Sequence, residues 1–175
     1  MNRVSKRITA CMLLLSIILG CFSINPIQLF AEYRVIEYGD GDVYEGNVLA
    51  NGKKDGSGTY KYKDGTVITG TWKKGVLSGS VTIDYPDGDK YVGNIKKGKK
   101  SGKGTYYYSN GDVFKGSWKN DKRNGKGKYT WSTGWFLSGT WKKGKLNGKC
   151  KLKLLGHTYT IQFKNGKLKK VISKR

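Results

Sequence analysis

Few residues in this chain of 175 residues could perform acid–base or nucleophilic chemistry. His157 is the single histidine, and Cys150 is the one cysteine beyond residue 21. A catalytic nucleophile needs an adjacent base that a third group orients, and no carboxylate side chain follows Asp121 in the sequence. Neither a P-loop nor a dinucleotide-binding fingerprint occurs. We therefore expect a chain that is not an enzyme and needs no cofactor, with His157 in a turn or strand and Cys150 packed as an apolar thiol.

Two short acidic segments could suggest a metal site. They are Asp40-Gly41-Asp42 and Asp87-Gly88-Asp89. A calcium-binding loop needs more acidic residues at fixed spacing and typically ends in a bidentate Glu. Both segments share their phase in a repeat with Asn110-Gly111-Asp112, which favours hairpin turns. We expect no metal ligands among them.

Lysine is the residue type that indicates most about binding. The chain carries a formal net charge of +22. Residues 32–89 hold 7 basic and 10 acidic residues, whereas residues 90–175 hold 24 basic and 2 acidic residues. Lysine outnumbers arginine 28 to 3 after residue 31, which suits diffuse attraction to an anion better than sequence-specific recognition of a nucleic acid.

Many of these basic residues recur in the segment that follows the first strand of each repeat. One interpretation is that they only keep strand ends soluble and prevent pairing of sheet edges. Because they are numerous and one-sided, with the acids mainly at the opposite hairpin tips, we favour the binding of an anionic surface. The candidate anion-binding residues are Lys73, Lys74, Lys96, Lys97, Lys99, Lys100, Lys119, Lys122, Arg123, Lys142, Lys143 and Lys145.

An internal repeat must position these lysines. Five segments align, over residues 41–64, 65–87, 88–110, 111–133 and 134–155. In each, a bulky residue, a glycine and a second bulky residue stand two apart, which places them on one face of a strand. The intervening residues are mostly polar, so the other face is solvated. The framework residues are Tyr44, Gly46, Gly70, Trp72, Tyr91, Gly93, Phe114, Gly116, Trp118, Gly139 and Trp141.

A second strand follows in each repeat, and half repeats over residues 32–40 and 156–175 bring the total to about twelve strands; the second of these half repeats ends in a basic tail. Each strand glycine leaves room for an aromatic ring over the backbone. The tips Asp64-Gly65, Asp87-Gly88 and Asn110-Gly111 predict two-residue turns in which both residues have positive φ. The pattern predicts an all-β fold: an elongated, single-layer antiparallel sheet of tandem β-hairpins.

The recurring order Tyr-x-Gly-x-Trp, a glycine-bearing loop and then Gly-x-Gly closely resembles the MORN repeat (membrane occupation and recognition nexus) over residues 41–155. The resemblance implies an elongated single-layer sheet that binds proteins, anionic phospholipid or itself. Choline-binding hairpin repeats of cell-wall proteins are a weaker resemblance, because their Gly-Trp starts and Trp-Tyr-Tyr run are missing. Individual repeats depart from the MORN pattern at Val48, Val81, Ile95, Asp121 and Cys150.

Residues 1–31 differ from the rest of the chain. They begin with basic residues and continue as an apolar run from Ile8 to Phe22. This order predicts a cleavable secretory signal, with cleavage after Ala31. A lipoprotein processed at Cys21 and an uncleaved membrane anchor are the alternatives, although the apolar run is shorter than the roughly 20 residues of a membrane-spanning helix.

Together these patterns predict an exported, non-catalytic binding or scaffold protein, secreted or associated with the cell surface. Its basic edge would engage anionic membrane lipid or a polyanionic wall polymer. The alternative is a structural protein that self-associates, or docks a protein partner, through its aromatic face, because a single layer leaves that face uncovered. A carbohydrate-binding role for the Tyr and Trp side chains rests on composition alone.

Overall fold

The computed structural model describes residues 31–175, and all of its regular structure there is β-strand. Alternating bulky and small polar residues, interrupted by glycines, favour short strands over helices. The strands are β1 (Glu32–Glu37), β2 (Val43–Val48), β3 (Lys54–Lys61), β4 (Val67–Lys73), β5 (Val76–Asp84), β6 (Lys90–Lys96), β7 (Lys99–Tyr107), β8 (Val113–Lys119), β9 (Lys122–Thr130), β10 (Phe136–Lys142), β11 (Lys145–Leu146), β12 (Gly148–Leu154), β13 (His157–Lys164) and β14 (Lys167–Lys174).

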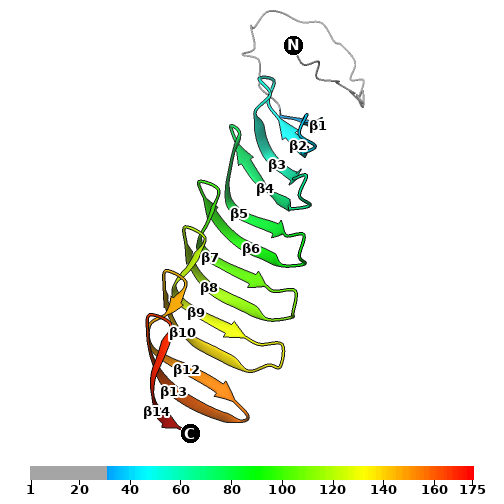
Figure 1. Cartoon of the computed structure of the whole chain (residues 1–175). Coiled ribbons are helices and arrows are strands. Elements are labelled where there is room, and N and C mark those ends of the chain that lie inside the picture. The colour runs from blue at the N-terminus through cyan, green and yellow to red at the C-terminus, as the bar shows by residue number, and fades with distance from the viewer. Residues whose placement is uncertain (1–30) are drawn as a thin grey trace, which may run out of the picture.

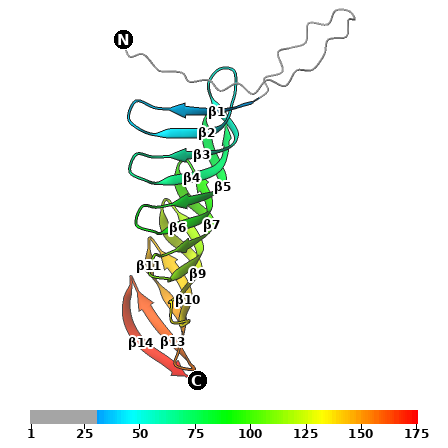
Figure 2. The ribbon, with the colours of Figure 1, turned by 90° about the vertical axis from the view of Figure 1, so that its right-hand side faces the viewer.

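The strands form one open antiparallel sheet in which each strand pairs with its neighbours in the sequence. The short β11 pairs with β10 beside β12, so β11 and β12 together form one side of a hairpin. Figure 1 shows the strands stacked as rungs along one axis, and Figure 2 shows β13 and β14 running at an angle to β1 and β2. The right-handed twist of strands accumulates into this coil. The predicted fold class, an elongated single layer, is confirmed.

Tight two-residue turns close the hairpins along one side of the sheet, except for the longer β2–β3 loop. In the turn between β4 and β5, Lys74 and Gly75 have φ angles of 51° and 87°. Two successive positive φ values define a type I′ turn, whose twist matches that of the flanking strands. We call this side the lysine edge, and its turns lie at residues 74–75, 97–98, 120–121, 143–144 and 165–166.

The opposite side, which we call the acidic edge, has three-residue loops in its first five hairpins and a two-residue turn at Leu155-Gly156 in the last. At the β3–β4 tip, the Gly65 amide donates to the Tyr62 carbonyl at 2.9 Å, and the Tyr62 amide donates to the Thr66 carbonyl at 2.8 Å. Gly65 alone has positive φ there, at 90°. The Asp64 carboxylate accepts the Thr66 amide at 2.7 Å, a local turn that needs no positive φ at Asp64.

The prediction of two-residue turns at Asp64-Gly65, Asp87-Gly88 and Asn110-Gly111 was therefore wrong. In each tip only the glycine has positive φ. An Asp-Gly or Asn-Gly dipeptide is compatible with a type I′ turn. It is equally compatible with a type I turn followed by a left-handed glycine, so the dipeptide alone does not distinguish the two.

A bulge interrupts the second strand of each repeat. Between β6 and β7, Gly93 pairs with Gly104 but Ile95 pairs with Lys100, so the register shifts by two residues. The segment that the sequence pattern assigned to a glycine-bearing loop thus stays in the sheet. Each of these five bulges contains a glycine at positive φ, and these glycines are Gly56, Gly79, Gly102, Gly125 and Gly148.

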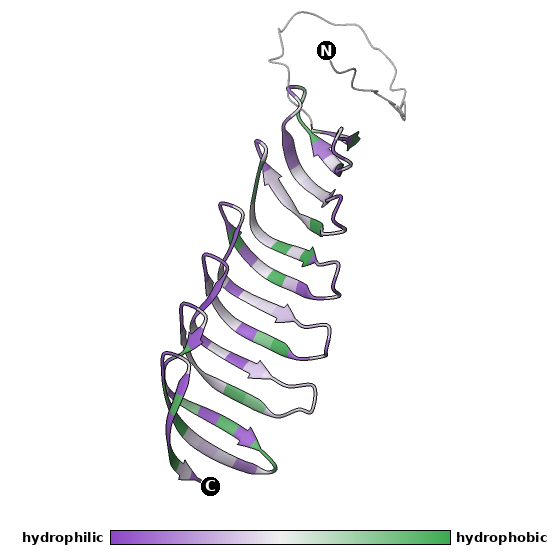
Figure 3. Ribbon diagram, in the orientation of Figure 1, coloured by the Kyte–Doolittle hydropathy of each residue, from purple (hydrophilic) through white to green (hydrophobic). Residues whose placement is uncertain are grey.

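One face of the sheet, which we call the inner face, carries the core. Tyr44, Tyr91 and Phe114 are fully buried, although a single layer has no second sheet to cover them. The rings cover one another instead: Phe114 packs edge-on against Trp118 at 5.4 Å and Trp141 at 5.0 Å between centroids. Figure 3 shows hydrophobic and hydrophilic residues alternating along the strands. The aromatic face is therefore largely buried by its own side chains.

The strand glycines accommodate these rings. A Cβ atom at Gly127 would lie 2.6 Å from Cζ of Phe114, and one at Gly58 would lie 2.5 Å from the hydroxyl oxygen of Tyr44. Each ring thus covers a glycine of the neighbouring strand. The Tyr44 hydroxyl also donates to the Asn47 carbonyl at 3.0 Å, which fixes the ring along its own strand.

Aspartates on the acidic edge join successive hairpins. Asp89, just before β6, accepts the Tyr106 hydroxyl at 2.6 Å and the Ser109 amide at 2.8 Å, both from the next hairpin. Asp42, two repeats earlier, and Asp112, one repeat later, make the same two kinds of contact. We call each such aspartate, with its tyrosine and amide, an acid clamp. The Asp-Gly-Asp segments thus use their carboxylates as hydrogen-bond acceptors.

Two joints in the stack lack the clamp. One follows Trp135, which stands at the phase of Asp89. The other lies around β5 and is weaker on both sides of the sheet, and we call it the unclamped joint. At the phase of Asp89 and Tyr106, the preceding repeat carries Thr66 and Ile83, and the donor position is Pro86, which has no N–H. On the lysine edge near the same joint, Gly98 makes no amide bond to the carbonyl of Leu77 within the described chain. Both sides of the sheet are thus less tightly tied around β5.

Three further expectations concern the ends of the chain. Residues 167–174, which the sequence analysis placed in a basic tail, form β14, and β11 adds another strand to the twelve expected. The signal peptide, apart from Ala31 itself, lies outside the described residues. Within residues 31–175 no helix could cross a bilayer.

Candidate anion-binding surface

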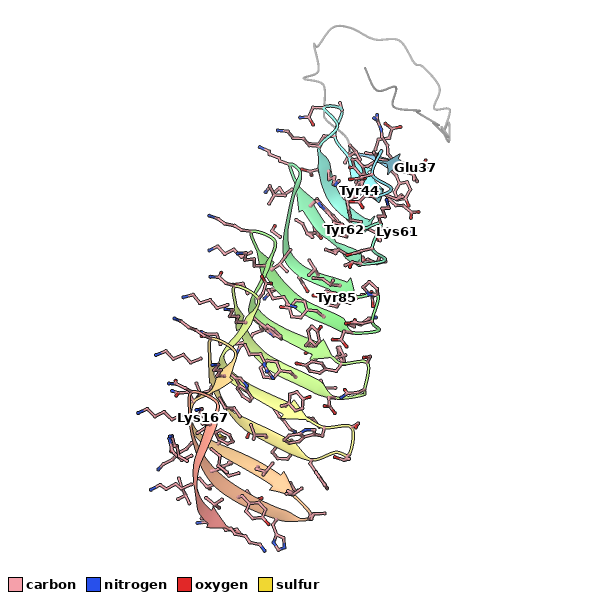
Figure 4. All side chains as sticks on the ribbon, viewed as in Figure 1. Glu37, Tyr44, Lys61, Tyr62, Tyr85 and Lys167 are labelled. Atoms are coloured by element: carbon pink, nitrogen blue, oxygen red, sulfur yellow. The ribbon has the colours of Figure 1, made fainter. Side chains whose placement is uncertain are left out.

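The lysine edge brings together most of the predicted anion-binding residues. Lys73, Lys96, Lys119 and Lys142 end β4, β6, β8 and β10, and their side chains are exposed. Lys74, Lys97 and Lys143 occupy the turns themselves, with φ of 51° to 52°. Figure 4 shows nitrogen-tipped side chains projecting in a row from this edge, with Lys167 near its lower end.

Lysines face each other across four successive hairpins of this edge. Lys96 pairs with Lys99, Lys119 with Lys122, Lys142 with Lys145 and Lys164 with Lys167. Like charges directly opposite each other destabilise a sheet. Sequence reasoning missed the last pair because it placed residues 164–167 in a terminal half repeat. In the N-terminal half the equivalent pair is Lys73 and Val76, which is not a like-charge pair.

The turns of this edge, apart from the one at Lys97-Gly98, are each bonded to the preceding hairpin. The Gly75 amide donates to the Lys54 carbonyl at 2.7 Å, and the Gly144 amide donates to the Arg123 carbonyl at 2.8 Å. The side chain of Asp55 accepts the Lys74 amide at 2.8 Å in the same way. Equivalent turns are two strands apart, so they recur about every 10 Å along the sheet. The lysines therefore stand on a rigid, regular support.

Lys100 and Arg123, which were assigned to the anion-binding set, do not project from the lysine edge with the others. Lys100 lies on the inner face, where its ammonium is 4.9 Å from the ring centroid of Tyr106 and 3.1 Å from the hydroxyl oxygen of Tyr85. The Arg123 guanidinium lies 5.4 Å from the Phe114 ring. Both residues are the second after a two-residue turn, and alternation along the strand points that position inward.

Lys54 occupies the same inner position two repeats before Lys100. Its ammonium lies 4.1 Å from the Tyr60 ring and 4.9 Å from the Tyr44 ring. Burial lowers the pKa of Lys54. These half-buried cations pack over ring faces on the inner face, so they do not belong to the row of lysines at the edge.

A second array of lysines lies on the outer face, opposite the core. Lys115 pairs with Lys128, and Lys103 and Lys126 stand two residues before Thr105 and Lys128 on the same face. Sequence reasoning noted some outer-face lysines only as solvated strand residues. The sequence does contain a pattern that indicates this array. The residues at the position of Lys103 in the successive repeats, 23 residues apart, are Ser57, Ser80, Lys103, Lys126 and Lys149.

Carboxylates do not neutralise these lysines. Within residues 31–175 the ion pairs are Arg34–Glu32, Lys61–Glu45 and Lys90–Asp84. No lysine beyond Lys90 has a carboxylate partner in this part of the chain. Both the lysine edge and the outer face after β6 are therefore positive surfaces without ion pairs, although Asp55 and Asp121 stand on the lysine edge.

The remaining candidate chemistry stays apart. Cys150 is buried beneath Gly139, its thiol donates weakly to the Gly148 carbonyl at 3.8 Å, and burial raises its pKa. His157 begins β13 and lies 6.2 Å from the Tyr159 ring. Among the described residues, no group of three potential metal ligands occurs.

Comparison with known proteins supports the repeat assignment. The model of the MORN repeat matches residues 44–67, 69–90, 91–113, 114–136 and 138–154. A comparison with curated proteins gave no match. The TCP domain of SAS-4 from Drosophila melanogaster, solved with a proline-rich motif of Ana2, is 15% identical at a TM-score of 0.42, covering 83% of this chain and 97% of that domain. A variant of the TCP10 domain of Danio rerio CPAP is 13% identical at a TM-score of 0.32, covering 79% and 70%. At these TM-scores neither structure supports a functional inference.

Proposed function

Because the chain belongs to the MORN repeat family, we propose that it is a non-catalytic binding and scaffold module that attaches to anionic membrane lipid through the lysine edge. The proposal includes a location outside the cytoplasm, on the cell surface, because residues 1–31 have the order of an export signal.

The observation that carries the proposal is the set of opposed lysine pairs. Lys96–Lys99, Lys119–Lys122 and Lys142–Lys145 repeat along one edge without carboxylate partners in the described chain. Each opposed pair disfavours folding, so a role in solubility alone would be met as well by alternating charges. An external anion would relieve this repulsion.

The spacing of the pairs suits an extended surface. Near an anionic membrane each lysine contributes on the order of 1 kcal/mol, so binding requires several at once. Physiological salt screens charges over roughly 8 Å, which is comparable to the spacing of about 10 Å between equivalent turns. Attraction is then strong only when the whole edge lies against the membrane.

Sedimentation with vesicles tests the proposal. We expect the full chain to bind vesicles of phosphatidylglycerol and phosphatidylcholine, and to release steeply as salt rises. An edge variant, Lys96→Thr, Lys97→Asn, Lys142→Thr and Lys143→Asn, should lose at least tenfold in affinity; Asn120 already occupies the turn phase of Lys97 and Lys143.

The matched control removes inner-face cations. Lys100→Leu and Arg123→Leu introduce the residue type found at the same phase in Leu77 and Leu146. This control should bind vesicles as the parent does. Equal binding by the edge variant, or binding that ignores salt, would contradict the role of the edge.

A protein partner on the inner face is the second candidate. A cavity of about 250 Å³ opens there between Tyr62, Ile68, Ile83 and Tyr85, beside the unclamped joint. Tyr62 is 41% exposed, whereas most inner-face rings are covered. This cavity could receive one side chain of a partner. The substitution Ile83→Trp would fill this cavity. It should prevent binding of a protein partner there and leave vesicle binding unchanged, which distinguishes the two candidates.

A further inference from the structure

The outer face contains a groove that runs across five successive strands, β5 to β9. Its volume is about 770 Å³, and Gly93, Gly104, Gly116 and Gly127 line it. These glycines are consecutive partners in the sheet register, so they form a continuous row at right angles to the strands. The groove therefore follows the long axis of the molecule over roughly 19 Å.

Lysines form the walls of this groove. Lys103 and Lys126 stand on one side of the glycine row, and Lys115 and Lys128 stand on the other. All four side chains are exposed, and none has a carboxylate partner within residues 31–175. The Lys103 ammonium donates to the Ser117 hydroxyl at 3.1 Å, and the Lys128 ammonium lies 4.0 Å from the Phe136 ring.

The same positions carry no lysine in the N-terminal repeats, where the row begins with Glu45 on β2. The register links Thr59, Thr69, Thr82, Val92 and Thr105 across β3 to β7 before it reaches Lys115 and Lys128. Threonine is a good strand residue that would also serve in the C-terminal repeats. The sheet instead opposes two lysines there, which disfavours folding and points to an anionic ligand.

The shape and chemistry of the groove select one class of anion. The groove is lined by serine, threonine, asparagine, valine, glycine and lysine, without an aromatic ring on which a nucleobase could stack. A planar membrane would contact the tips of the walls and leave the recessed glycine floor empty. Ammonium groups act as point charges toward phosphate oxygens and require no fixed plane.

We propose that this groove binds a linear phosphate polymer, which lies along the glycine row with lysines on both sides. The site goes beyond the proposed membrane attachment, because it uses other lysines and another ligand.

Fluorescence anisotropy with labelled linear inorganic polyphosphate tests the inference. A groove variant, Lys103→Ser, Lys115→Thr, Lys126→Ser and Lys128→Thr, carries residue types that Ser80, Thr69, Ser57 and Thr82 show at the same phases. We expect its dissociation constant to rise at least tenfold. The edge variant also loses four charges, and its dissociation constant should rise less than threefold.

A footprint on the unchanged full chain provides a second readout if the groove variant folds poorly. Polyphosphate should protect Lys103, Lys115, Lys126 and Lys128 from acetylation, whereas Lys97 and Lys143 should stay reactive, as mass spectrometry would show. Parent-like binding by the groove variant, equal loss in both variants, or uniform protection of all lysines would overturn the inference. Loss of vesicle binding by the groove variant, with polymer binding intact, would overturn it in favour of a wider membrane surface. Failure of the edge variant to affect vesicles would leave this site standing.

Discussion

The hairpins before residue 90 and those after it share one framework and present different surfaces. In both regions a ring covers glycines and packs on a tryptophan, as Tyr44 does on Trp72 and Phe114 does on Trp141. Their charges differ, with a net −3 over residues 32–89 and +22 over residues 90–175. The inner-face positions are set by packing, and the outer face is free to vary. The outer-face and edge lysines of the second region therefore indicate function rather than fold.

Replacing framework glycines should have the largest effect, and an equal one in both regions. Gly116→Val places a side chain where Cζ of Phe114 would be 2.7 Å from its Cβ, and Gly46→Val meets the Tyr44 hydroxyl oxygen at 2.8 Å. We expect each change to lower the free energy of unfolding by about 3 kcal/mol. Urea denaturation measures it, with the outer-face change Lys115→Val as the control. Similar stabilities for the three variants would show that the glycines are not packing positions.

Adding lysines to the outer face of the N-terminal repeats should increase the binding of polyphosphate. Ser57→Lys, Thr59→Lys, Ser80→Lys and Thr82→Lys extend the lysine walls toward the N-terminus. We expect the affinity for linear polyphosphate to rise about tenfold at low salt, since each released counterion adds to binding. The control Asp40→Asn, Asp64→Asn and Asp87→Asn raises the net charge nearly as much, at the acidic edge. If that control gains as much affinity, net charge rather than position determines binding.

The acid clamps at Asp89 and Asp112 should make the joints that they tie sensitive to acid. Hydrogen bonds from the hydroxyls of Tyr106 and Tyr129 hold the pKa values of Asp89 and Asp112 below their usual range. A pKa lowered in the folded state stabilises the fold above the unfolded value of about 3.9, and this stabilisation is lost as the pH falls through the folded value. The melting temperature of the parent should therefore decrease as the pH is lowered from about 4. The decrease should be smaller in Asp112→Asn.

Two substitutions compare a clamped joint with the unclamped one. Tyr129→Phe removes one hydrogen bond to Asp112 and should reduce stability by about 1 kcal/mol. Thr66→Asp should gain almost nothing, because Ile83 has no hydroxyl and Pro86 has no amide hydrogen to donate. A clear rise in melting temperature for Thr66→Asp would show that one residue suffices for the clamp.

The smallest effect should come from single opposed lysines. Lys122→Thr removes the repulsion with Lys119, and we expect a gain of about 0.5 kcal/mol at low salt that disappears at high salt. The control is Lys73→Thr. Lys73 faces Val76 rather than a lysine, so this variant should show no such gain in stability. Thermal unfolding at two salt concentrations distinguishes them. A gain that persists at high salt would have to come from strand propensity instead.

The inner face could be predicted from the period of two, because burial on one face leaves little freedom of register. The alternation alone assigns Tyr44, Gly46 and Trp72 to that face. The direction of Lys100 could not be predicted, because it depends on where the preceding turn ends. The sequence pattern predicted only a loop that contains glycine, which does not fix the face to which Lys100 points. The two-residue turn at Lys97-Gly98 fixes that face.

The site was harder to predict than the fold for a related reason. Lys103 and Lys115 belong to different strands and are 12 residues apart, so their proximity follows from the loop that joins β7 to β8 and from the register that it sets. The acid clamps likewise join residues about 17 to 21 apart. Aligning the repeats at their spacing of 23 residues could have revealed the lysine phase, but not the groove.

The unclamped joint around β5 has a mechanical consequence. A stack of hairpins behaves like springs in series, and a load applied to its ends concentrates strain in the softest spring. Thr66, Ile83, Pro86 and the unbonded Gly98 amide reduce the stiffness of one joint, which lies close to where the charge changes sign. The ribbon should flex there first, with its acidic and basic parts moving as two stiffer arms. If the basic part is bound to its ligand, the acidic part can change its orientation by bending at this joint.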